Sequence, residues 1–307
     1  MRYYLLYFLP LFLLAIKHEP ITPIPQTIKY NKQKALLGKE LFFDSQFSSD
    51  KTISCASCHL PKYGGADPRK VSIGVFGRLG EIQSPTVYNA VYNFRQFWNG
   101  RAYDLKEQIM GPTHNPVEMG MNKTKIEKIL NSNKKYKKKF FKIYKTDKIT
   151  FDMFAEAIAE FETTLITPNC KFDRWLRDEV KLTKLEKDGY MNFKKLGCIN
   201  CHNGVNIGGN SFQKIGIIHP LKERWEDRYV ITKNPNDKNV YKVPTLRNIE
   251  LTSPYFHNGL VYGLDEAINK MAHFNLGLEL SEYQVKSIKA FLKTLTGETP
   301  TMVKDIK

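Results

Sequence analysis

The sequence predicts a mainly helical protein that contains two similar units. Apolar residues recur at helical spacing in three segments, 32–43, 151–165 and 281–295. A capping-box pattern at Thr183 and Glu186 opens a fourth helix. Few segments alternate apolar and polar residues as strands do, and one five-residue motif occurs twice. A chain of 307 residues has room for two domains.

The repeated motif is C-x-x-C-H. It is formed by Cys55, Ala56, Ser57, Cys58 and His59, and again by Cys198, Ile199, Asn200, Cys201 and His202. Two thiols at this spacing can each add to one vinyl group of a haem, and the adjacent His then binds the iron. One copy could also hold zinc or act as a redox dithiol. Two copies that use four of the five cysteines favour two covalently bound haem c groups, and Cys170 is expected to be a free, buried thiol.

The N-terminal residues predict export. Arg2 precedes an apolar run from Tyr3 to Ile16, which is short for a membrane span and typical of a signal peptide. Because no clear cleavage site follows, residues 1–16 are predicted to be either a signal peptide or an N-terminal membrane anchor. Covalent haem attachment in bacteria also takes place outside the cytoplasm, so both signals predict a periplasmic protein. Residues 17–31 contain three prolines and are expected to be extended.

The formal charge of +16 comes largely from lysine runs such as the one at 134–139. No aromatic pattern or nucleic-acid motif accompanies these runs, so they predict a solvated basic face and no nucleic-acid partner. Such a face can steer an acidic redox partner or favour an anionic membrane surface.

Blocks of sequence around the two motifs match in register. Residues 84–89, 97–100 and 105–109 correspond to residues 243–248, 256–259 and 264–268, with equal spacing between blocks. This pattern predicts that the two units arose by internal duplication. Trp98 aligns with His257, and Gln108 with Ala267, so the two copies are specialised for different work. Pro168, after the helical segment 151–165, marks a boundary between domains at 32–166 and 167–307.

These motifs closely resemble those of the bacterial di-haem cytochrome c peroxidases. The resemblance runs from about Lys32 to Gly297 and includes the first C-x-x-C-H motif, residues 96–102, Glu118-Met119 and residues 254–259. It implies two cytochrome-c-like domains with one haem each. The N-terminal, low-potential haem would reduce hydrogen peroxide, and the C-terminal, high-potential haem would receive electrons from a small donor protein, a cytochrome c or a cupredoxin. A homodimer is also implied.

The resemblance assigns the iron ligands. His59 and His202 are the expected proximal ligands, and Met271 is the expected second axial ligand of the second haem, where a thioether raises the reduction potential. The equivalent position in the first unit is Pro112, which cannot bind iron. The first haem is therefore expected to keep a position for substrate.

Three further residues are expected to serve peroxide reduction. Peroxide must lose a proton from one oxygen and gain one at the other, and a single carboxylate can do both. The resemblance places Glu118 in that role, and Gln108 beside it as an amide that orients peroxide. Trp98 matches the family's tryptophan between the two haems, where an indole can relay charge.

The sequence departs from the family pattern at two positions. Many members carry a His that caps the first iron at rest, and here that position is Val75. The first haem is therefore expected to lack His/His ligation at rest, with His114 as a weaker substitute. Gln83 stands where the family has an Asn of an inter-domain calcium site. Backbone carbonyls of Thr252 and Pro254 would complete that site, so calcium remains open.

Two other functions are compatible with two haem-binding motifs. A related branch of di-haem enzymes oxidises a protein partner with peroxide, but it carries Tyr where this chain has Met271. A plain electron carrier would need neither Glu118, Gln108 nor Trp98. A peroxidase is the function that all these residues favour.

Overall fold

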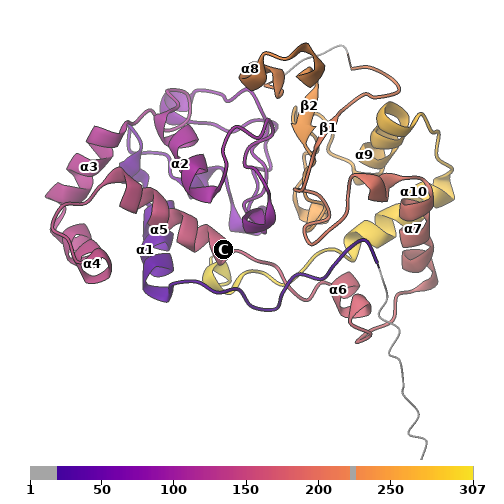
Figure 1. Ribbon diagram of the computed structural model, residues 1–307, viewed down its shortest axis with the longest axis horizontal. Coiled ribbons are helices and arrows are strands. Elements are labelled where there is room, and N and C mark those ends of the chain that lie inside the picture. Colours follow the sequence, from indigo (N-terminus) through magenta and orange to yellow (C-terminus); the bar gives the residue numbers. More distant parts are fainter. Residues whose placement is uncertain (1–18, 222–225, 307) are drawn as a thin grey trace, which may run out of the picture.

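The computed structural model describes residues 19–221 and 226–306, so the expected signal peptide or anchor at 1–16 lies outside the described residues. The described chain is mainly helical, as predicted, and forms two lobes side by side (Figure 1). A small antiparallel sheet pairs β1, Phe212–Lys214, with β2, Val240–Lys242. Strands of three residues carry no clear alternation in the sequence, and this sheet was not predicted.

The first lobe contains five α-helices. They are α1 (Lys32–Phe43), α2 (Leu105–His114), α3 (Lys123–Ser132), α4 (Lys134–Tyr144) and α5 (Phe151–Thr163). The second lobe contains α6 (Lys171–Leu176), α7 (Lys184–Lys195), α8 (Tyr229–Thr232), α9 (Leu264–Met271) and α10 (Glu282–Lys293). The four predicted helices are confirmed as α1, α5, α7 and α10, and Thr183 and Glu186 form the predicted capping box of α7.

Each lobe is built on a close crossing of two helices. In the first lobe, α1 meets α5 at Gly38, where an added Cβ would lie 1.8 Å from the carbonyl oxygen of Ala157. In the second lobe, α7 meets α10 at Gly189, where it would lie 1.9 Å from that of Ser287. Only glycine allows the two backbones to approach this closely, so both crossings depend on the same residue type at the same place.

Aromatic residues one turn beyond these glycines connect each helix crossing with the C-x-x-C-H motif of the same lobe through ring contacts. The rings of Phe42 and Phe161 are 5.2 Å apart, and Phe42 lies 6.5 Å from the ring of His59. In the second lobe, Phe193 lies 5.1 Å from Phe291 and 6.4 Å from the ring of His202. Each helix pair therefore places a phenylalanine against the histidine of its own motif.

A buried hydrogen-bond network joins the lobes. Asn89 and Asn248, which occupy matched positions of the repeated blocks, both have a φ of 60°. Their side-chain amides donate to the same hydroxyl, that of Thr167, at 2.7 and 2.9 Å. All three residues are buried, so the matched loops of the two lobes meet at one residue of the connecting segment.

Each end of the described chain packs against the lobe formed by the opposite part of the sequence. Residues 19–31 form neither helix nor strand and run along the second lobe, where Arg247 donates to the carbonyl of Thr22 at 3.0 Å and Ile21 joins the core. At the other end, Val303 belongs to the core of the first lobe, and the C-terminus lies near α1 and α5 (Figure 1). These crossings tie the two lobes together.

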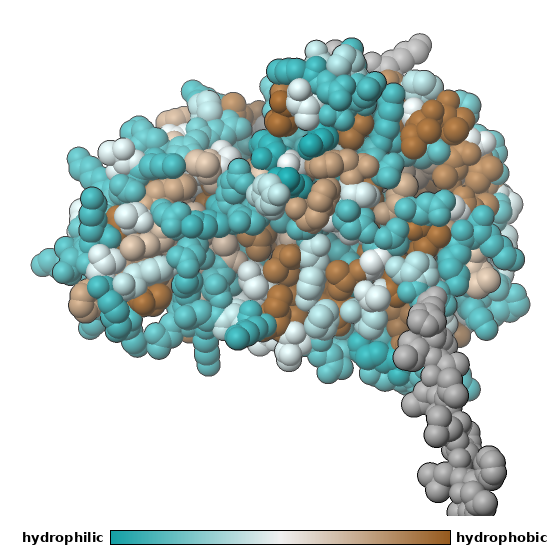
Figure 2. All heavy atoms as spheres, in the orientation of Figure 1, coloured by the Kyte–Doolittle hydropathy of each residue, from teal (hydrophilic) through white to brown (hydrophobic). Residues whose placement is uncertain are grey.

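Lysines cover the outer face of α4, while Tyr136 and Phe140 of the same helix are buried. Hydrophilic residues cover most of the first lobe in Figure 2, whereas apolar residues gather over part of the second lobe. Cys170 is buried and free, as predicted. Within residues 19–221 and 226–306, no helix has the length and apolar character required to cross a bilayer.

Candidate functional site

The first C-x-x-C-H motif lines a cavity of about 300 Å³ in the first lobe, here called the first cavity. Cys55, Cys58 and His59 form part of its wall, with Glu118, Gln108 and Trp98 on other parts. The three residues expected to serve peroxide reduction are therefore brought to the same cavity as the first haem-binding motif. Of the described residues that line it, His59 is the only histidine.

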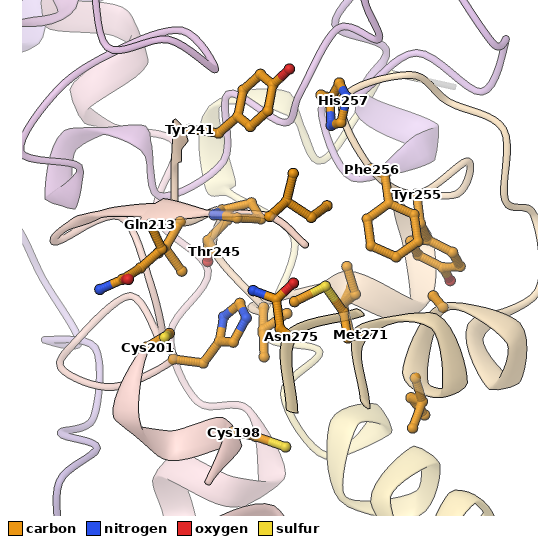
Figure 3. Close-up of a pocket in the computed structure, with 18 of the residues that line it drawn as sticks. Cys198, Cys201, Gln213, Tyr241, Thr245, Tyr255, Phe256, His257, Met271 and Asn275 are labelled. Atoms are coloured by element: carbon orange, nitrogen blue, oxygen red, sulfur yellow. The ribbon is translucent and has the colours of Figure 1, made fainter. Parts of the chain in front are cut away.

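The second motif lines a separate cavity of about 260 Å³, here called the second cavity. Cys198, Cys201 and His202 line it together with Met271. Figure 3 shows the sulfur of Met271 pointing into this cavity, with Cys198 and Cys201 beyond it on the wall formed by the motif. The cavity therefore holds both residue types expected to bind the second iron.

The two histidines fit the haem that the motifs predict. Nδ1 of His59 lies 3.3 Å from the carbonyl oxygen of Gly65, an arrangement in which Nδ1 donates and Nε2 is left to bind iron. Nδ1 of His202 is buried without a hydrogen-bond partner in the described structure. Burial lowers the pKa of both imidazoles, for His202 to about 4, so both are neutral, as a metal ligand must be.

Glu118 lies on the loop after α2, where one neighbour binds its side chain and another acts on it through charge. Its Oε1 accepts a hydrogen bond from the side chain of Asn115 at 2.6 Å. Burial raises the pKa of the Glu118 carboxyl, while the Asn115 amide and the charge of Arg101 oppose that rise. Arg101 itself stacks on Phe97 at 3.5 Å and pairs with Glu226 of the second lobe at 3.5 Å. A carboxyl in this setting can both accept and return a proton.

The loop that carries Val75 is locked against the Glu118 segment. Val75 is fully buried, and its N–H donates to the carbonyl of Glu118 at 2.9 Å. A Cβ on the preceding Gly74 would lie 1.9 Å from the carbonyl oxygen of Val117. His114 does not line the first cavity; its ring packs on Phe151 at 5.4 Å and its Nδ1 lies 2.8 Å from the carbonyl of Met110.

Met271 ends helix α9, and the chain continues as a five-residue π-helix, Ala272–Leu276. π-helical turns are rare and occur often at functional sites, because the extra residue redirects the side chains of one turn. Pro112, the matched residue of the first lobe, lies inside α2 and lines the first cavity. The two cavities therefore differ at the position where a second axial ligand would stand.

Trp98 lies between the cavities and lines both. Its indole N–H donates to the carbonyl of Gln83 at 2.8 Å, and its carbonyl accepts from the N–H of Lys242 at 2.7 Å. The ring of His257 is 6.2 Å from Trp98, and Tyr241 stacks on His257 at 4.2 Å. The rings of His257 and Tyr241, which Figure 3 shows on the wall of the second cavity, therefore continue from Trp98, which lines both cavities.

The three residues expected at a calcium site lie on the wall of the same cavity. Gln83, Thr252 and Pro254 all line the second cavity, and Gln83 lines the first as well. Gln83 is buried, and its side-chain amide donates to the carbonyl of Asp67 at 3.4 Å. The described part of the chain has no cluster of three or more His, Cys, Asp or Glu side chains placed to hold a metal ion.

Sequence reasoning assigned no role to Arg101, Asn115, Glu162 or Lys242. The sequence does contain a signal for Arg101. Leu260 occupies the matched position after the second copy of the block, so only the first copy has a charged residue there. Glu162 and Lys242 line the first and second cavity, respectively, and are buried. Burial of a single charged residue in an otherwise ordinary helix or strand has no sequence signal.

Comparison with known proteins defines the class. The family model "Di-haem cytochrome c peroxidase" matches residues 32–181. The cytochrome c551 peroxidase of Nitrosomonas europaea is 46% identical and aligns with 92% of this chain and 86% of its own. That of Pseudomonas aeruginosa is 39% identical over 91% of this chain and 84% of its own. A crystal structure of a MauG-like protein associated with microbial copper homeostasis superposes with a TM-score of 0.79 at 26% identity, covering 92% and 94% of the two chains.

The chain therefore belongs to the di-haem cytochrome c peroxidase family. It is an oxidoreductase of the peroxidase class, as the sequence motifs predicted. Membership of this family implies haem c as cofactor, hydrogen peroxide as substrate and a redox partner as the source of electrons.

Proposed function

We propose that the enzyme reduces hydrogen peroxide in the first cavity, with electrons that a small periplasmic redox protein delivers to the haem of the second cavity. His59 would be the proximal ligand of the first haem, and His202 and Met271 the axial ligands of the second. The observation that carries this proposal is the distribution of the candidate catalytic residues and of Met271 between the two cavities. Glu118 and Gln108 line the first cavity, where Pro112 stands at the position matched to Met271, whereas Met271 lines the second.

When bound, the first haem supplies the electrons that cleave the O–O bond of peroxide. Glu118 accepts the proton that peroxide loses and returns it to the oxygen that leaves as water. Asn115 holds the carboxylate by its hydrogen bond, and Gln108 orients peroxide from the facing helix α2. Because Glu118 must be ionised to accept a proton, the rate should rise with pH through the raised pKa of this carboxyl.

Trp98 would carry electrons between the haems, since it lines both cavities and is fixed by hydrogen bonds on both sides. The donor would be a cytochrome c or a cupredoxin. The alternative of a protein-oxidising enzyme is less favoured, because Met271 faces the second cavity where that branch carries Tyr.

Replacement of Glu118 by Gln tests the function. We expect peroxide-dependent oxidation of a reduced small cytochrome c to fall by about 10²- to 10⁴-fold, because one proton-transfer group is lost. Both haems should remain attached, as counted by the pyridine haemochrome spectrum. Glu282→Gln, at an exposed position of α10, is the matched control. A peroxidase rate that survives Glu118→Gln would refute the assignment.

We also propose that the first haem is open at rest. His59 is the sole histidine on the described wall of the first cavity, and Val75 is packed in place of a capping His. The fully oxidised enzyme should therefore give a high-spin ferric EPR signal that disappears on mixing with peroxide before any reductant is added. A purely low-spin spectrum would contradict this proposal.

The two lobes are proposed to be cytochrome-c-like domains, 32–166 and 167–307, that arose by duplication. The matched glycine crossings and the equal φ of Asn89 and Asn248 support this origin. Calcium at Gln83, Thr252 and Pro254, a homodimer, and either a signal peptide or an anchor at 1–16 complete the proposal.

A further inference from the structure

Glu162 is a buried carboxyl that the peroxidase chemistry described above does not use. It lies at the end of helix α5, is 4% exposed, and lines the first cavity together with Cys55 and His59. Within the described structure its side chain has no hydrogen bond and no ion pair. A carboxyl is rarely buried without a partner, because the loss of hydration is costly. Its position on the cavity wall therefore requires an explanation.

The second lobe has an apolar residue at the matched position. The crossing glycines place Ala157 of α5 opposite Gly38 and Ser287 of α10 opposite Gly189. Counting five residues on from each reaches Glu162 in the first lobe and Leu292 in the second. Leu292 is also 4% exposed and lines the second cavity. One cavity therefore has a carboxyl where the other has a hydrocarbon side chain.

Several charged residues of α5 and of the helices packed against it form ion pairs that do not include Glu162. On α5 itself and on the helices that pack against it, Lys34 pairs with Glu156, Glu40 with Lys139, and Lys106 with Asp152. The other ionisable residues on the cavity wall are Cys58, His59, Glu81, Arg101, Glu118 and Glu226. Cys55 is the group whose pKa Glu162 raises by its charge, so the carboxyl lies near the haem-attachment point.

A carboxyl so placed must respond to the charge of the iron. Oxidised haem carries one more positive charge than reduced haem, so it favours an ionised neighbour, whereas reduced haem favours a protonated one. Burial raises the pKa of Glu162 to about 8, so both forms are accessible near neutral pH. The reverse effect is equally required: an ionised carboxyl stabilises the ferric state and lowers the reduction potential.

We propose that Glu162 takes up one proton when the first haem is reduced by one electron, and that its ionised form holds the potential of this haem below that of the second. In the balanced step, ferric iron, one electron, the Glu162 carboxylate and one proton from solvent give ferrous iron and the Glu162 carboxylic acid. The inference rests on the proposed attachment of the first haem to Cys55, Cys58 and His59. Glu162 acts here through charge and not by contact with peroxide.

Spectroelectrochemical titration of the holoenzyme between pH 6 and 10 tests the proposal. We expect the potential of the first haem to fall as pH rises above the pKa of Glu162 in the ferric enzyme, by up to 59 mV per pH unit for a one-electron couple. In Glu162→Gln and Glu162→Leu that dependence is lost. At pH 9 and a fixed applied potential, the ferrous-to-ferric ratio of the first haem should be about tenfold higher than in the unmodified enzyme. The second haem should titrate unchanged.

Glu156→Gln is the matched control, because Glu156 lies on the outer side of the same helix and pairs with Lys34. Its first haem should keep the unmodified potential and pH dependence. A pyridine haemochrome count of two haems per chain in each variant tests the attachment separately, so loss of a haem would refute the proposed function and not this inference. With both haems present, an unchanged potential or a persistent pH dependence in Glu162→Gln would overturn it.

Discussion

The two cavities share one framework but differ in the carboxyl or amino side chain buried in the wall, which is Glu162 in the first and Lys242 in the second. The first is lined by Glu118, Glu162 and Arg101, with carboxyls in the majority. The described wall of the second includes Lys242 and Lys214 and no acidic residue. An ionised carboxylate stabilises ferric iron and an ammonium group stabilises ferrous iron, so Glu162 when ionised and Lys242 when protonated would separate the two potentials. The proposed axial ligands act in the same direction.

The framework itself is the same in both lobes. Glycine allows each helix crossing, a phenylalanine packs on each proximal histidine, and an asparagine with a φ of 60° closes each loop. Differences are concentrated on the cavity walls, at the pairs Glu162 and Leu292, Pro112 and Met271. The molecule therefore keeps the residues that set backbone geometry and varies those that set chemistry.

Removal of Met271 should have the largest effect on the comparison. Met271→Ala deprives the second haem of its proposed thioether ligand, and we expect its potential to fall by roughly a few tenths of a volt, since axial ligands set haem potentials over about 0.8 V. Redox titration followed at the haem absorption bands measures this shift. Met153→Leu, at a half-buried site on α5, is the control. A second haem that keeps its potential without Met271 would show that another residue is the ligand.

The glycine crossings should fail equally in both lobes. Gly38→Ala and Gly189→Ala would each force a Cβ against a backbone carbonyl oxygen, at 1.8 and 1.9 Å in the present geometry. We expect each to lower the free energy of unfolding by about 1–3 kcal/mol, the usual cost of overpacking, as measured by denaturant titration. Gly263→Ala is the control, because its nearest neighbour would be 3.8 Å away. Loss of stability in one lobe alone would mean that the crossings are not equivalent.

Removal of the indole of Trp98 should reduce communication between the cavities. In Trp98→Phe the hydrogen bond to the carbonyl of Gln83 is lost together with the relay. Steady-state peroxide turnover should fall about tenfold, equivalent to about 1.4 kcal/mol in the barrier. Stopped-flow measurement should find reduction of the second haem by donor unchanged. Trp175→Phe, at a tryptophan stacked on Phe172 in the second lobe, should leave turnover intact.

Sequence reasoning predicted the helical fold class, four helices, and a C-x-x-C-H motif for each cavity, with candidate site residues that line the same cavities. These features have local or strongly constrained signals: helical spacing, a capping box and C-x-x-C-H. Helices α3 and α4 were not predicted, and the lysines of α4 were interpreted only as a basic surface. The contact between Arg101 and Glu226 joins two lobes, and such a long-range pair has no local pattern.

The buried ionisable residues show more clearly what a sequence pattern cannot predict. Glu162 follows Phe161 in an amphipathic helix, where any polar residue suggests the solvent face. Lys242 precedes Val243 in a strand of three residues, too short to indicate which face is buried. Only the packed structure shows that both side chains face a cavity.

Replacement of Lys242 should have the smallest effect of these changes, a small shift in the reduction potential of the second haem. Lys242 is 6% exposed, and burial lowers its pKa to about 8, so it is charged below that pH and neutral above it. Its charge favours ferrous iron; the potential of the second haem should therefore fall as pH rises through about 8. Lys242→Met should remove this dependence and lower the potential at pH 7 by a few tens of mV, roughly the effect of one charge at a distance in a medium of intermediate dielectric constant.

Lys214→Met is the matched control, because Lys214 lines the same cavity but is exposed and screened by solvent. Its effect on the potential should be smaller than that of Lys242→Met, and the pH dependence should persist. If both variants shift the second haem equally, the buried charge has no special role. The difference in potential between the two haems would then rest on the axial ligands and on Glu162.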